Sequence, residues 1–559
     1  MYFDWLNNDS RTFLSRGYLG EDQSAEDRIL EIAKTAERIL NIEGFADKFY
    51  EYMAKGFYSL SSPVWSNFGN NRGLPISCNG VYVGDTVASI LTKSAEVGMQ
   101  TKHGAGTSGY FGDIRARGSK IKTGGTADGP VHFMEIFETN TDVISQGSVR
   151  RGSFAAYIDI EHPDVEEFLE IREVGHTIQN LSLGLCITDA WMNAMIAEGE
   201  AVKAGRMPSA EAKKLKLWAR VMRKRKESGY PYLFFTDTVN NNKPQVLKDK
   251  ELKIHASNLC SEICLPSGED ESFVCNLASM NIVTYDDWKN TDAVEVMTYF
   301  LDAVMTDYIE KTSKIPFMEA SNNFARRWRA LGIGQLGWHS YLQSKLIPFE
   351  SYQAMALTAE IGKFMDDRSN AASAEMAKLF GEPEGLVGYG VRNLTRLAIA
   401  PTTSSSFILG QVSPSIEPLR SNYFTKDLAK GSFTYKNPYL AKVLEAHNKN
   451  DDDTWYSILT HKGSVQHLDF LTENEKLVFK TFDEIVPLSI VQQASVRQKY
   501  IDQSQSLNLL IPPNAPIKDI NALIIEGWRL GVKTFYYQRS SNPSQDLVTD
   551  IMNCVSCEA

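Results

Sequence analysis

Short apolar runs alternate with longer helical patterns through most of the chain, and this alternation limits the folds that it can adopt. The apolar runs are bounded by glycine-rich turns, as in residues 79–85 and 103–125. Between them, apolar residues recur at helical spacing, as in residues 211–227, 292–311 and 351–380. Because parallel strands need a long and usually helical connection, the alternation predicts an α/β fold with a largely parallel sheet.

The two ends of the chain differ from this middle part. Residues 22–58 carry apolar positions at helical spacing and are predicted to form helices. Residues 538–559 are polar and weakly periodic, which is typical of a mobile tail. We therefore predict an N-terminal helical region over 1–59, an α/β body over 60–537 and a flexible tail over 538–559.

Composition argues against several classes of protein. The 559-residue sequence has no apolar run of about 18 residues or more, so we expect no membrane span. Its N-terminus lacks a basic flank followed by an apolar segment, so we predict no signal peptide there. The net charge of −11 argues against a broad nucleic-acid surface.

The seven cysteines are too few, and odd in number, for a secreted disulfide scaffold. We therefore expect a cytoplasmic protein, either bacterial or in the cytoplasm of a host if the chain is encoded by a phage. In a reducing compartment, the cysteines that matter are usually catalytic, redox-active or metal-binding.

The segment ASNLCSEIC, residues 256–264, sets an amide, a thiol and a carboxylate at every second position. In an extended chain Asn258, Cys260 and Glu262 would share one face. The outer two would lie roughly 13 Å apart in a flat strand, too far to act on one small molecule. If the three residues act together, the segment must curve, as at the tip of a loop. The segment alone leaves two interpretations open: a catalytic cysteine with a base and an orienting amide, or a half-buried strand with a polar face.

Further motifs accompany this segment in a fixed order. They are PISCNG around Cys78, VCNLASMN around Cys275, RALGIGQLGWHS (329–340), APTTSSSFILG (400–410), KTFYYQ (533–538) and the terminal pair Cys554 and Cys557. Together with Asn-x-Cys-x-Glu, these motifs resemble the large catalytic subunit of ribonucleotide reductase over residues 60–559. The resemblance implies a ten-stranded α/β barrel with a central finger loop.

The resemblance implies radical chemistry at Cys260. In that family this cysteine becomes a thiyl radical, which would abstract the 3′ hydrogen of a ribonucleotide. Glu262 would take the 3′-hydroxyl proton as general base, and Asn258 would hold the substrate hydroxyls. The 2′ hydroxyl is a poor leaving group on an unactivated carbon, and a radical at C3′ makes its departure feasible. The implied activity is reduction of ribonucleoside diphosphates or triphosphates to 2′-deoxyribonucleotides.

Two cysteine pairs would carry the reducing electrons. Cys78 and Cys275 resemble the pair that delivers two electrons and ends as a disulfide. Cys554 and Cys557 would then exchange disulfides with that pair and with thioredoxin or glutaredoxin. Zinc is the alternative for a C-x-x-C pair, but the sequence has no second such pair or His-rich segment to complete a site. We therefore expect no metal or other cofactor bound by this chain.

Nucleotide sites also follow from the resemblance. The hydroxyls and N–H groups where residues 400–410 enter a helix would suit the phosphates of a substrate. The implied substrate contacts are Ser62, Ser77, Thr402, Ser404, Ser405 and Ser406. A nucleoside triphosphate effector, a dNTP or ATP, would bind Asp85, Arg115, Ile121 and Lys122. Gln146 and Arg150 would belong to the loop that passes the identity of the effector to the substrate site. Read without the resemblance, these residues could equally be a capping turn and solvated surface turns.

The source of the radical is predicted from two adjacent tyrosines. Tyr536 and Tyr537 resemble the stacked pair that relays a radical from a small beta subunit with a dimetal (iron or manganese) site, with Tyr536 nearer Cys260. Adjacent residues of a strand face opposite sides, so stacking requires a local departure from strand geometry. Class I is therefore predicted, and the alternative is class II, which uses adenosylcobalamin. A thiol-disulfide or nucleotide-binding protein without radical chemistry would leave Asn258 and Glu262 unexplained.

The resemblance carries two further expectations. Effector sites in this family usually lie at a dimer interface, so we expect a homodimer. Cys78 comes so early in the sequence that the ATP-binding cone of many relatives does not fit before it. We therefore expect no inhibition by dATP through residues 1–50.

Overall fold

The computed structural model describes residues 2–144, 152–428, 431–512 and 514–540. Four predicted site residues lie outside the described residues: Gln146, Arg150, Cys554 and Cys557. Within the described part of the chain, no helix is long and apolar enough to cross a membrane.

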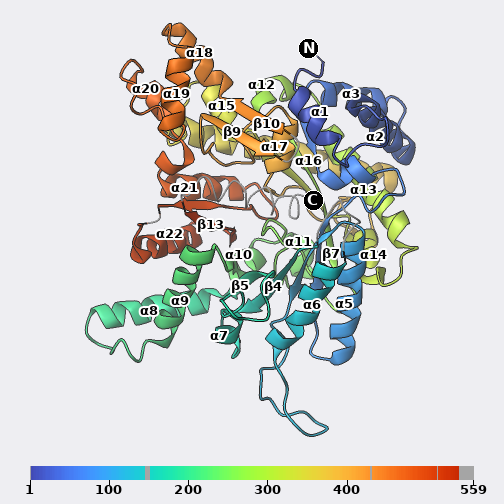
Figure 1. Cartoon of the computed structure of the whole chain (residues 1–559). Helices are drawn as coiled ribbons and strands as arrows, with labels where there is room; N and C mark the ends of the chain where they lie inside the picture. Colours follow the sequence, from blue (N-terminus) through green and yellow to red (C-terminus); the bar gives the residue numbers. More distant parts are fainter. Residues whose placement is uncertain (1, 145–151, 429–430, 513, 541–559) are drawn as a thin grey trace.

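A nine-stranded sheet forms the centre of the molecule (Figure 1). Its order is β1-β7-β2-β3-β4-β5-β6-β12, with β8 also paired to β7. The strands are β1 (Tyr58–Leu60), β2 (Cys78–Tyr82), β3 (Gly106–Tyr110), β4 (Phe154–Asp159), β5 (Ser182–Ile187), β6 (Tyr232–Phe235), β7 (Phe273–Asn281), β8 (Leu331–Leu336) and β12 (Thr534–Phe535). The pairings from β2 to β6 and between β7 and β8 are parallel. The pairings β1–β7, β2–β7 and β6–β12 are antiparallel. The prediction of a largely parallel sheet is therefore confirmed.

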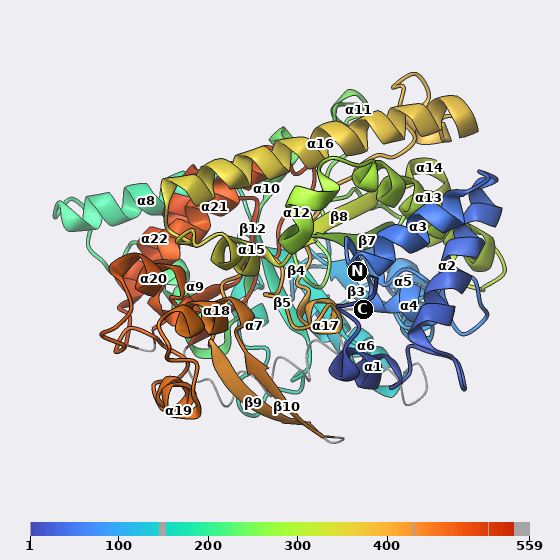
Figure 2. The same cartoon turned by 90° about the horizontal axis from the view of Figure 1, so that it is seen from above.

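Hydrogen bonds continue the sheet beyond its named strands. Residues 395–399 bridge to β8, and residues 503–507 bridge to residues 395–399. The N–H of Tyr536, directly after β12, donates to the carbonyl of Leu507 (3.0 Å). Because β12 pairs with β6, these contacts curl the sheet back toward its other edge. In Figure 2 the strands are grouped near the middle of the view, with helices outside them.

The predicted N-terminal helices pack directly on this body. α2 (Ala25–Leu40) and α3 (Phe45–Ala54) both contact α13 (Ala293–Thr312). The buried guanidinium of Arg28 donates to three carbonyls of α4 (Ser62–Asn67) and its C-cap. The apolar side chains of α2 and α3 thus belong to the same continuous core as the sheet.

The helices predicted from periodicity are present. They are α9 (Lys213–Ser228), α13 and α16 (Tyr352–Phe380). The side chain of Ser351 caps α16 by accepting from the N–H of Ala354, and Gly381 follows its last residue. This long helix crosses one side of the molecule (Figure 2) and packs against α13 and α21 (Pro487–Gln498).

A second, smaller apolar core lies beside the main one. It joins α18 (Pro438–Ala446), α19 (Asp452–Thr460) and α20 (Glu473–Val478) around Leu444 and Trp455. These helices lie at the upper left of Figure 1.

The remaining helices and strands complete the fold. The helices are α1 (Asn8–Leu14), α5 (Val87–Lys102), α6 (Pro130–Val143), α7 (Val165–Phe168), α8 (Asp189–Lys203), α10 (Thr236–Asn241), α11 (Gln245–Asp249), α12 (Tyr285–Trp288), α14 (Glu319–Trp328), α15 (Trp338–Ser344), α17 (Thr403–Ile408) and α22 (Ile517–Arg529). The strands are the hairpin β9 (Tyr423–Leu428) and β10 (Gly431–Lys436), and the parallel pair β11 (Leu509–Ile511) and β13 (Gln538–Ser540).

Candidate active site

The segment around Cys260 is a curved loop rather than a strand. It lies between α11 and β7, with a turn at Leu259–Cys260. Ser261 directly after the turn has φ 70°, in the left-handed region that non-glycine residues seldom adopt. The segment therefore has the curvature that the spacing of its three polar residues required.

Side chains from neighbouring strands hold this loop by its backbone carbonyls. Donors on β3, β4 and β5 each contribute a contact: Ser108 Oγ to Ser257 (2.8 Å), Tyr157 Oη to Asn258 (2.8 Å) and Cys186 Sγ to His255 (3.3 Å). Donors just before β11 and within β12 contribute two more: Ser506 Oγ to Cys260 (2.5 Å) and Thr534 Oγ1 to Ser261 (2.8 Å). The loop is thus anchored from both sides of the curled sheet. Cys186 thus has a structural role, as a donor to this loop.

Glu262 is buried at the centre of the site. Its Oε2 accepts a hydrogen bond from Ser506 Oγ (3.0 Å), and its Oε1 lies 4.0 Å from Sγ of Cys78. Burial raises the pKa of Glu262 to about 7, and its backbone hydrogen bond and the nearby polar groups of Asn258 and Ser506 oppose this shift. A carboxyl group with this pKa can both take and return a proton near neutral pH.

Asn258 adds a hydrogen-bond donor beside Glu262. Its Oδ1 accepts from the N–H of Ile263 (3.2 Å) and from Ser257 Oγ (3.2 Å). Its Nδ2 group is buried and has no hydrogen-bond partner within the described part of the chain. A buried amide donor of this kind is costly unless a ligand satisfies it.

Cys78 and Cys275 face each other across two strands. They are paired residues in the antiparallel register of β2 with β7. Such partners have Cα atoms roughly 4.5–5.5 Å apart, which lies within the range that a disulfide spans. Burial raises the pKa of the Cys275 thiol, and the nearby Cys78 and Glu262 raise it further. Gln503 opposes this shift, because its Nε2 donates to Sγ of Cys275 (3.2 Å).

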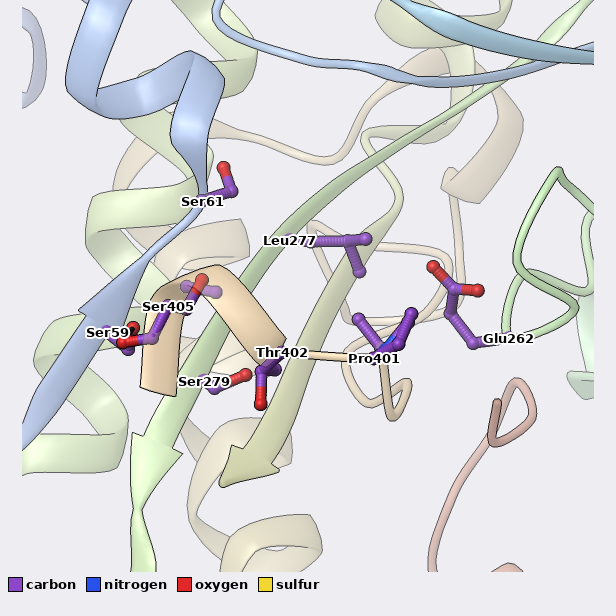
Figure 3. Close-up of a pocket in the computed structure, with 10 residues that line it drawn as sticks. Ser59, Ser61, Glu262, Leu277, Ser279, Pro401, Thr402 and Ser405 are labelled. Atoms are coloured by element: carbon purple, nitrogen blue, oxygen red, sulfur yellow. Dashed lines mark hydrogen bonds between the residues drawn. The ribbon is translucent and has the colours of Figure 1, made fainter. Parts of the chain in front are cut away.

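A small cavity opens beside Glu262 (Figure 3). Its lining comes from β1, β7, the loop and the segment that enters α17: Ser59, Ser61, Glu262, Leu277, Ala278, Ser279, Ala400, Pro401, Thr402 and Ser405. The serine and threonine hydroxyls lie toward one end and the carboxylate of Glu262 toward the other (Figure 3). The cavity therefore joins a hydroxyl-rich end to the candidate general base.

The predicted substrate contacts divide around this cavity. Thr402 and Ser405 line it. Ser406 lies behind them, bonded to Thr402 by a hydroxyl contact of 2.9 Å. Ser404 is buried on α17 and is not among the residues that line the cavity. Ser62, the first residue of α4, is not among the residues that line the cavity, and its Oγ lies 3.4 Å from Tyr18 Oη.

Ser77 lies next to the cysteine pair. It is buried directly before β2, and its carbonyl accepts from the N–H of Gly106 (2.9 Å).

Sequence reasoning missed Ser59, Ser61 and Ser279 as cavity residues. Ser59 and Ser279 are cross-strand partners in the pairing of β1 with β7. Their proximity is a consequence of register, which no local motif encodes.

Tyr536 and Tyr537 occupy the break between β12 and β13. Their ring centroids lie 4.3 Å apart, with the planes inclined by 54°. The expected departure from strand geometry is present, although the rings are tilted rather than parallel. The buried guanidinium of Arg225 donates to the carbonyl of Tyr536 (3.2 Å), which fixes the backbone at this break.

The predicted effector residues lie away from the cavity, near solvent. Arg115 Nε forms an ion pair with Asp85 Oδ2 (2.8 Å), and the N–H of Arg115 donates to Oδ1 (3.1 Å). Ile121 and Lys122 are exposed, in the segment between β3 and α6. Within the described residues, no group of three or more His, Cys, Asp or Glu side chains is placed to hold a metal ion.

Comparison with known proteins decides the family. A model described as the ribonucleotide reductase barrel domain matches residues 76–385 and 383–538. The chain is 37% identical over 505 residues to a putative ribonucleoside-diphosphate reductase large subunit of Frog virus 3, which covers 89% of this chain and 88% of that protein. It is 34% identical over 594 residues to the ribonucleoside-diphosphate reductase large subunit of Invertebrate iridescent virus 3, which covers 94% and 92% respectively. The chain belongs to the ribonucleotide reductase large-subunit family.

A solved structure supports the class. The Actinobacillus ureae class Id ribonucleotide reductase alpha subunit is 52% identical, with a TM-score of 0.90, and covers 97% of this chain and 98% of that one. These matches confirm the predicted fold class, an α/β barrel of the ribonucleotide reductase type. They also confirm the function as an oxidoreductase of deoxyribonucleotide synthesis, and they support class I over the adenosylcobalamin-dependent alternative.

Two polar residues of the reductase site were not predicted from the sequence. Gln503 contacts Cys275, and Ser506 contacts both Glu262 and the carbonyl of Cys260. Both come from the segment IDQSQSLN, residues 501–508, in which most residues are polar. The structure buries Gln503, Ser504, Gln505 and Ser506 of this segment. Buried polar side chains need partners, so such a stretch marks a hydrogen-bonding role.

Proposed function

We propose that this reductase acts on ribonucleoside diphosphates and receives its radical from a separate small subunit that carries two iron or manganese ions. The relatives named above are ribonucleoside-diphosphate reductases, which supports a diphosphate substrate. The observation that carries the proposal is the convergence at Glu262. Its carboxylate lines the cavity, lies 4.0 Å from Cys78 and is two residues from Cys260.

Each residue of the cluster has a step to perform. A thiyl radical at Cys260 abstracts the 3′ hydrogen of the ribose, and Glu262 takes the 3′-hydroxyl proton. The 2′ hydroxyl then leaves as water. The thiols of Cys78 and Cys275 together supply two electrons and two protons and become a disulfide, and Cys260 regains its radical when the 3′ hydrogen returns. The cross-strand register of the cysteine pair supports this last step.

The remaining polar groups position the substrate. The buried Nδ2 group of Asn258 is a donor that a ribose hydroxyl would satisfy. At the other end of the cavity, Thr402 and Ser405 offer hydroxyls for the phosphates. We assign Ser404, Ser406, Ser62 and Ser77 to the same substrate region, behind these contacts.

Turnover leaves a buried disulfide that must be reduced again. We propose that Cys554 and Cys557 exchange disulfides with Cys78 and Cys275, and then with thioredoxin or glutaredoxin. The radical would travel through Tyr537 and Tyr536 to Cys260. The contact between the two tyrosine rings supports this route.

Regulation is assigned to the region around Asp85. A nucleoside triphosphate effector would displace the ion pair of Asp85 with Arg115, so that the carboxylate binds its ribose and the guanidinium its phosphates. Ile121, Lys122, Gln146 and Arg150 complete the effector site and the loop that reads it.

A homodimer through α5 and α6 would complete this regulatory region. These two helices pack against each other. They carry exposed apolar residues, with Val87 62%, Leu91 55% and Val143 75% exposed. Such side chains in adjacent helices are suited to an interface.

The ten-stranded barrel is part of the proposal. The bridges from β8 to residues 395–399 and on to residues 503–507 would add two members to the strands β2 to β8 and β12. The loop around Cys260, anchored from β3, β4, β5 and residue 506, would be the finger inside it. We place the enzyme in a cytoplasm, which supplies the reducing partners.

The test is reduction of CDP by the purified chain with thioredoxin and a candidate metal-bearing small subunit. We expect deoxycytidine diphosphate only when the small subunit is present. Activity with adenosylcobalamin and no second protein would overturn the class I assignment. Activity with CTP but not CDP would overturn the assignment of a diphosphate substrate.

A further inference from the structure

Two more tyrosines adjoin the pair at 536 and 537. Tyr232 is the first residue of β6, which pairs with β12, and Tyr230 lies two residues before it. The ring of Tyr232 lies 4.7 Å from that of Tyr536 and 5.2 Å from that of Tyr537. The ring of Tyr230 lies 5.3 Å from that of Tyr537. The proposed relay is thus part of a buried cluster of four phenols.

One contact in this cluster joins two hydroxyl groups directly. The phenol oxygens of Tyr230 and Tyr537 lie 3.0 Å apart, within hydrogen-bonding distance. Both side chains are buried, with 6% and 8% of their surface exposed. We propose that Tyr230 is a third redox-active tyrosine, which exchanges a hydrogen atom with Tyr537 during radical transfer. This inference rests on the proposed role of Tyr537 as a radical carrier.

Backbone contacts order the cluster relative to the catalytic loop. The N–H of Tyr536 donates to Leu507, the neighbour of Ser506, which itself donates to the carbonyl of Cys260. The carbonyl of Tyr537 accepts from the N–H of Leu509, two residues further on. Tyr230 contacts Tyr537 by both ring and hydroxyl. Tyr230 therefore extends the series from Cys260 through Tyr536 and Tyr537 by one more phenol.

The exchange balances without any further reagent. When Tyr537 carries the radical, the O–H bond of Tyr230 breaks and an O–H bond forms on Tyr537. One proton and one electron move together, so one phenoxyl radical and one phenol exist before and after the step. Because the two side chains are chemically alike, the step is close to thermoneutral and can run in either direction.

Charged neighbours favour this coupled transfer over loss of an electron alone. The guanidinium of Arg172 lies 4.7 Å from the ring centre of Tyr230, and that of Arg539 lies 5.1 Å from the ring centre of Tyr537. The buried guanidinium of Arg225 contacts the carbonyl of Tyr536. Cations at these distances disfavour a positively charged phenol radical in a buried site. A hydrogen atom that passes between two hydroxyls creates no such charge.

Local backbone geometry keeps Tyr230 in register with Tyr537. Gly229 ends α9 with φ 81°, in the left-handed region. A Cβ atom at this glycine would lie 3.0 Å from the carbonyl oxygen of Gln538. The N–H of Gln538 in turn donates to the carbonyl of Gly229 (3.3 Å). The glycine therefore permits the close approach that sets the two hydroxyls opposite each other.

The deciding experiment places 3-aminotyrosine at position 230 of the full chain. This residue is nearly the same size as tyrosine and is easier to oxidise, so it traps a radical that reaches it. With the small subunit, CDP and effector, we expect an aminotyrosyl radical by electron paramagnetic resonance and a matching loss of the small-subunit radical. Its absence, while 3-aminotyrosine at position 537 traps a radical under the same conditions, would overturn the proposal.

A second variant tests whether the hydroxyl is needed. Tyr230→Phe keeps the ring beneath Arg172 and removes the hydrogen bond, and we expect turnover to fall about a hundredfold with nucleotide binding unchanged. Tyr285→Phe is the matched control, because it removes another hydroxyl of a buried tyrosine, one bonded to Glu360 (2.8 Å), and should retain turnover. Wild-type turnover in Tyr230→Phe would also overturn the proposal. If position 537 traps no radical either, the proposed relay itself fails, which is a different result.

Discussion

The loop around Cys260 and the turn around Arg115 are held in different ways. The loop is anchored by buried hydroxyl and thiol groups of several strands, which donate to its backbone carbonyls. Arg115 is held to Asp85 by an ion pair whose side chains are 40% and 34% exposed. A lost partner in a buried hydrogen bond costs about 1–3 kcal/mol, whereas an exposed ion pair contributes about 0–1 kcal/mol.

This contrast matches the work assigned to each region. Radical chemistry requires fixed distances between reacting atoms, so the catalytic loop is supported from many sides. An effector site must rearrange when its ligand binds, so a weak contact near solvent is sufficient there. The following predictions test the contrast, from the largest expected effect to the smallest.

Replacing the thiol at the tip of the loop should have the largest effect. Cys260→Ser should abolish CDP reduction, because a hydroxyl does not form the thiyl radical, while nucleotide binding stays as in the wild type. Product analysis and calorimetric binding measure the two properties. Residual turnover above background would show that another residue abstracts the hydrogen.

Glu262→Gln should lower turnover and change its pH dependence. Turnover should fall about 10²–10⁴-fold, because the general base is lost. The wild-type rate should rise with pH through about 7, the pKa of Glu262, and the rate of the variant should lack this step.

The same variant should change the pH dependence of folding. The pKa of Glu262 is raised by folding, so the wild type loses stability as pH rises from the unfolded value to about 7. The loss amounts to about 3 kcal/mol and is constant above that pH. Glutamine does not titrate, so the free energy of unfolding of Glu262→Gln relative to that of the wild type should be higher at pH 8 than at pH 5. Urea unfolding at the two pH values measures this difference. An unchanged difference between the two pH values would contradict the burial of a neutral carboxyl group.

Ser506→Ala should weaken the anchoring while leaving every proposed reacting group in place. The variant loses the hydrogen bonds to Glu262 and to the carbonyl of Cys260. We expect a loss of about 1–3 kcal/mol of stability and a shift of the pH–rate step to higher pH, because this contact lowers the pKa of Glu262. Ser495→Ala, which removes a bond to Leu530 near the surface, is the control and should move neither property. A pH profile that matches the wild type would remove Ser506 from the site.

Arg115→Ala should have the smallest effect on the protein itself. Stability should change by less than about 1 kcal/mol, because the lost ion pair is exposed. Turnover without effector should be retained, and the response to a nucleoside triphosphate should be lost. An unaltered effector response would show that the triphosphate binds elsewhere.

Local sequence patterns predicted much of the fold and part of the site. Periodicity identified α9, α13 and α16 to within two residues at each end. The spacing of Asn258, Cys260 and Glu262 required a curve, and a turn lies at Leu259–Cys260. Such features depend on neighbours in the chain, so they can be read from residue order.

Contacts between distant segments could not be predicted in this way. Sequence reasoning named Ser62 as a substrate contact and missed Ser61, which lines the cavity. Ser59 and Ser279 were missed because only the register of β1 with β7 joins them.

The sequence by itself determined which chemical groups are present and how they are spaced locally. Those groups are a thiol between an amide and a carboxylate, two adjacent phenols and two distant thiols. The tertiary structure decided which of them meet. Cys78 lies opposite Cys275 because β2 and β7 pair in one register, and Tyr230 reaches Tyr537 because β6 pairs with β12. The physical reason is that strand register is fixed by hydrogen bonds and packing over the whole sheet, which no short segment contains.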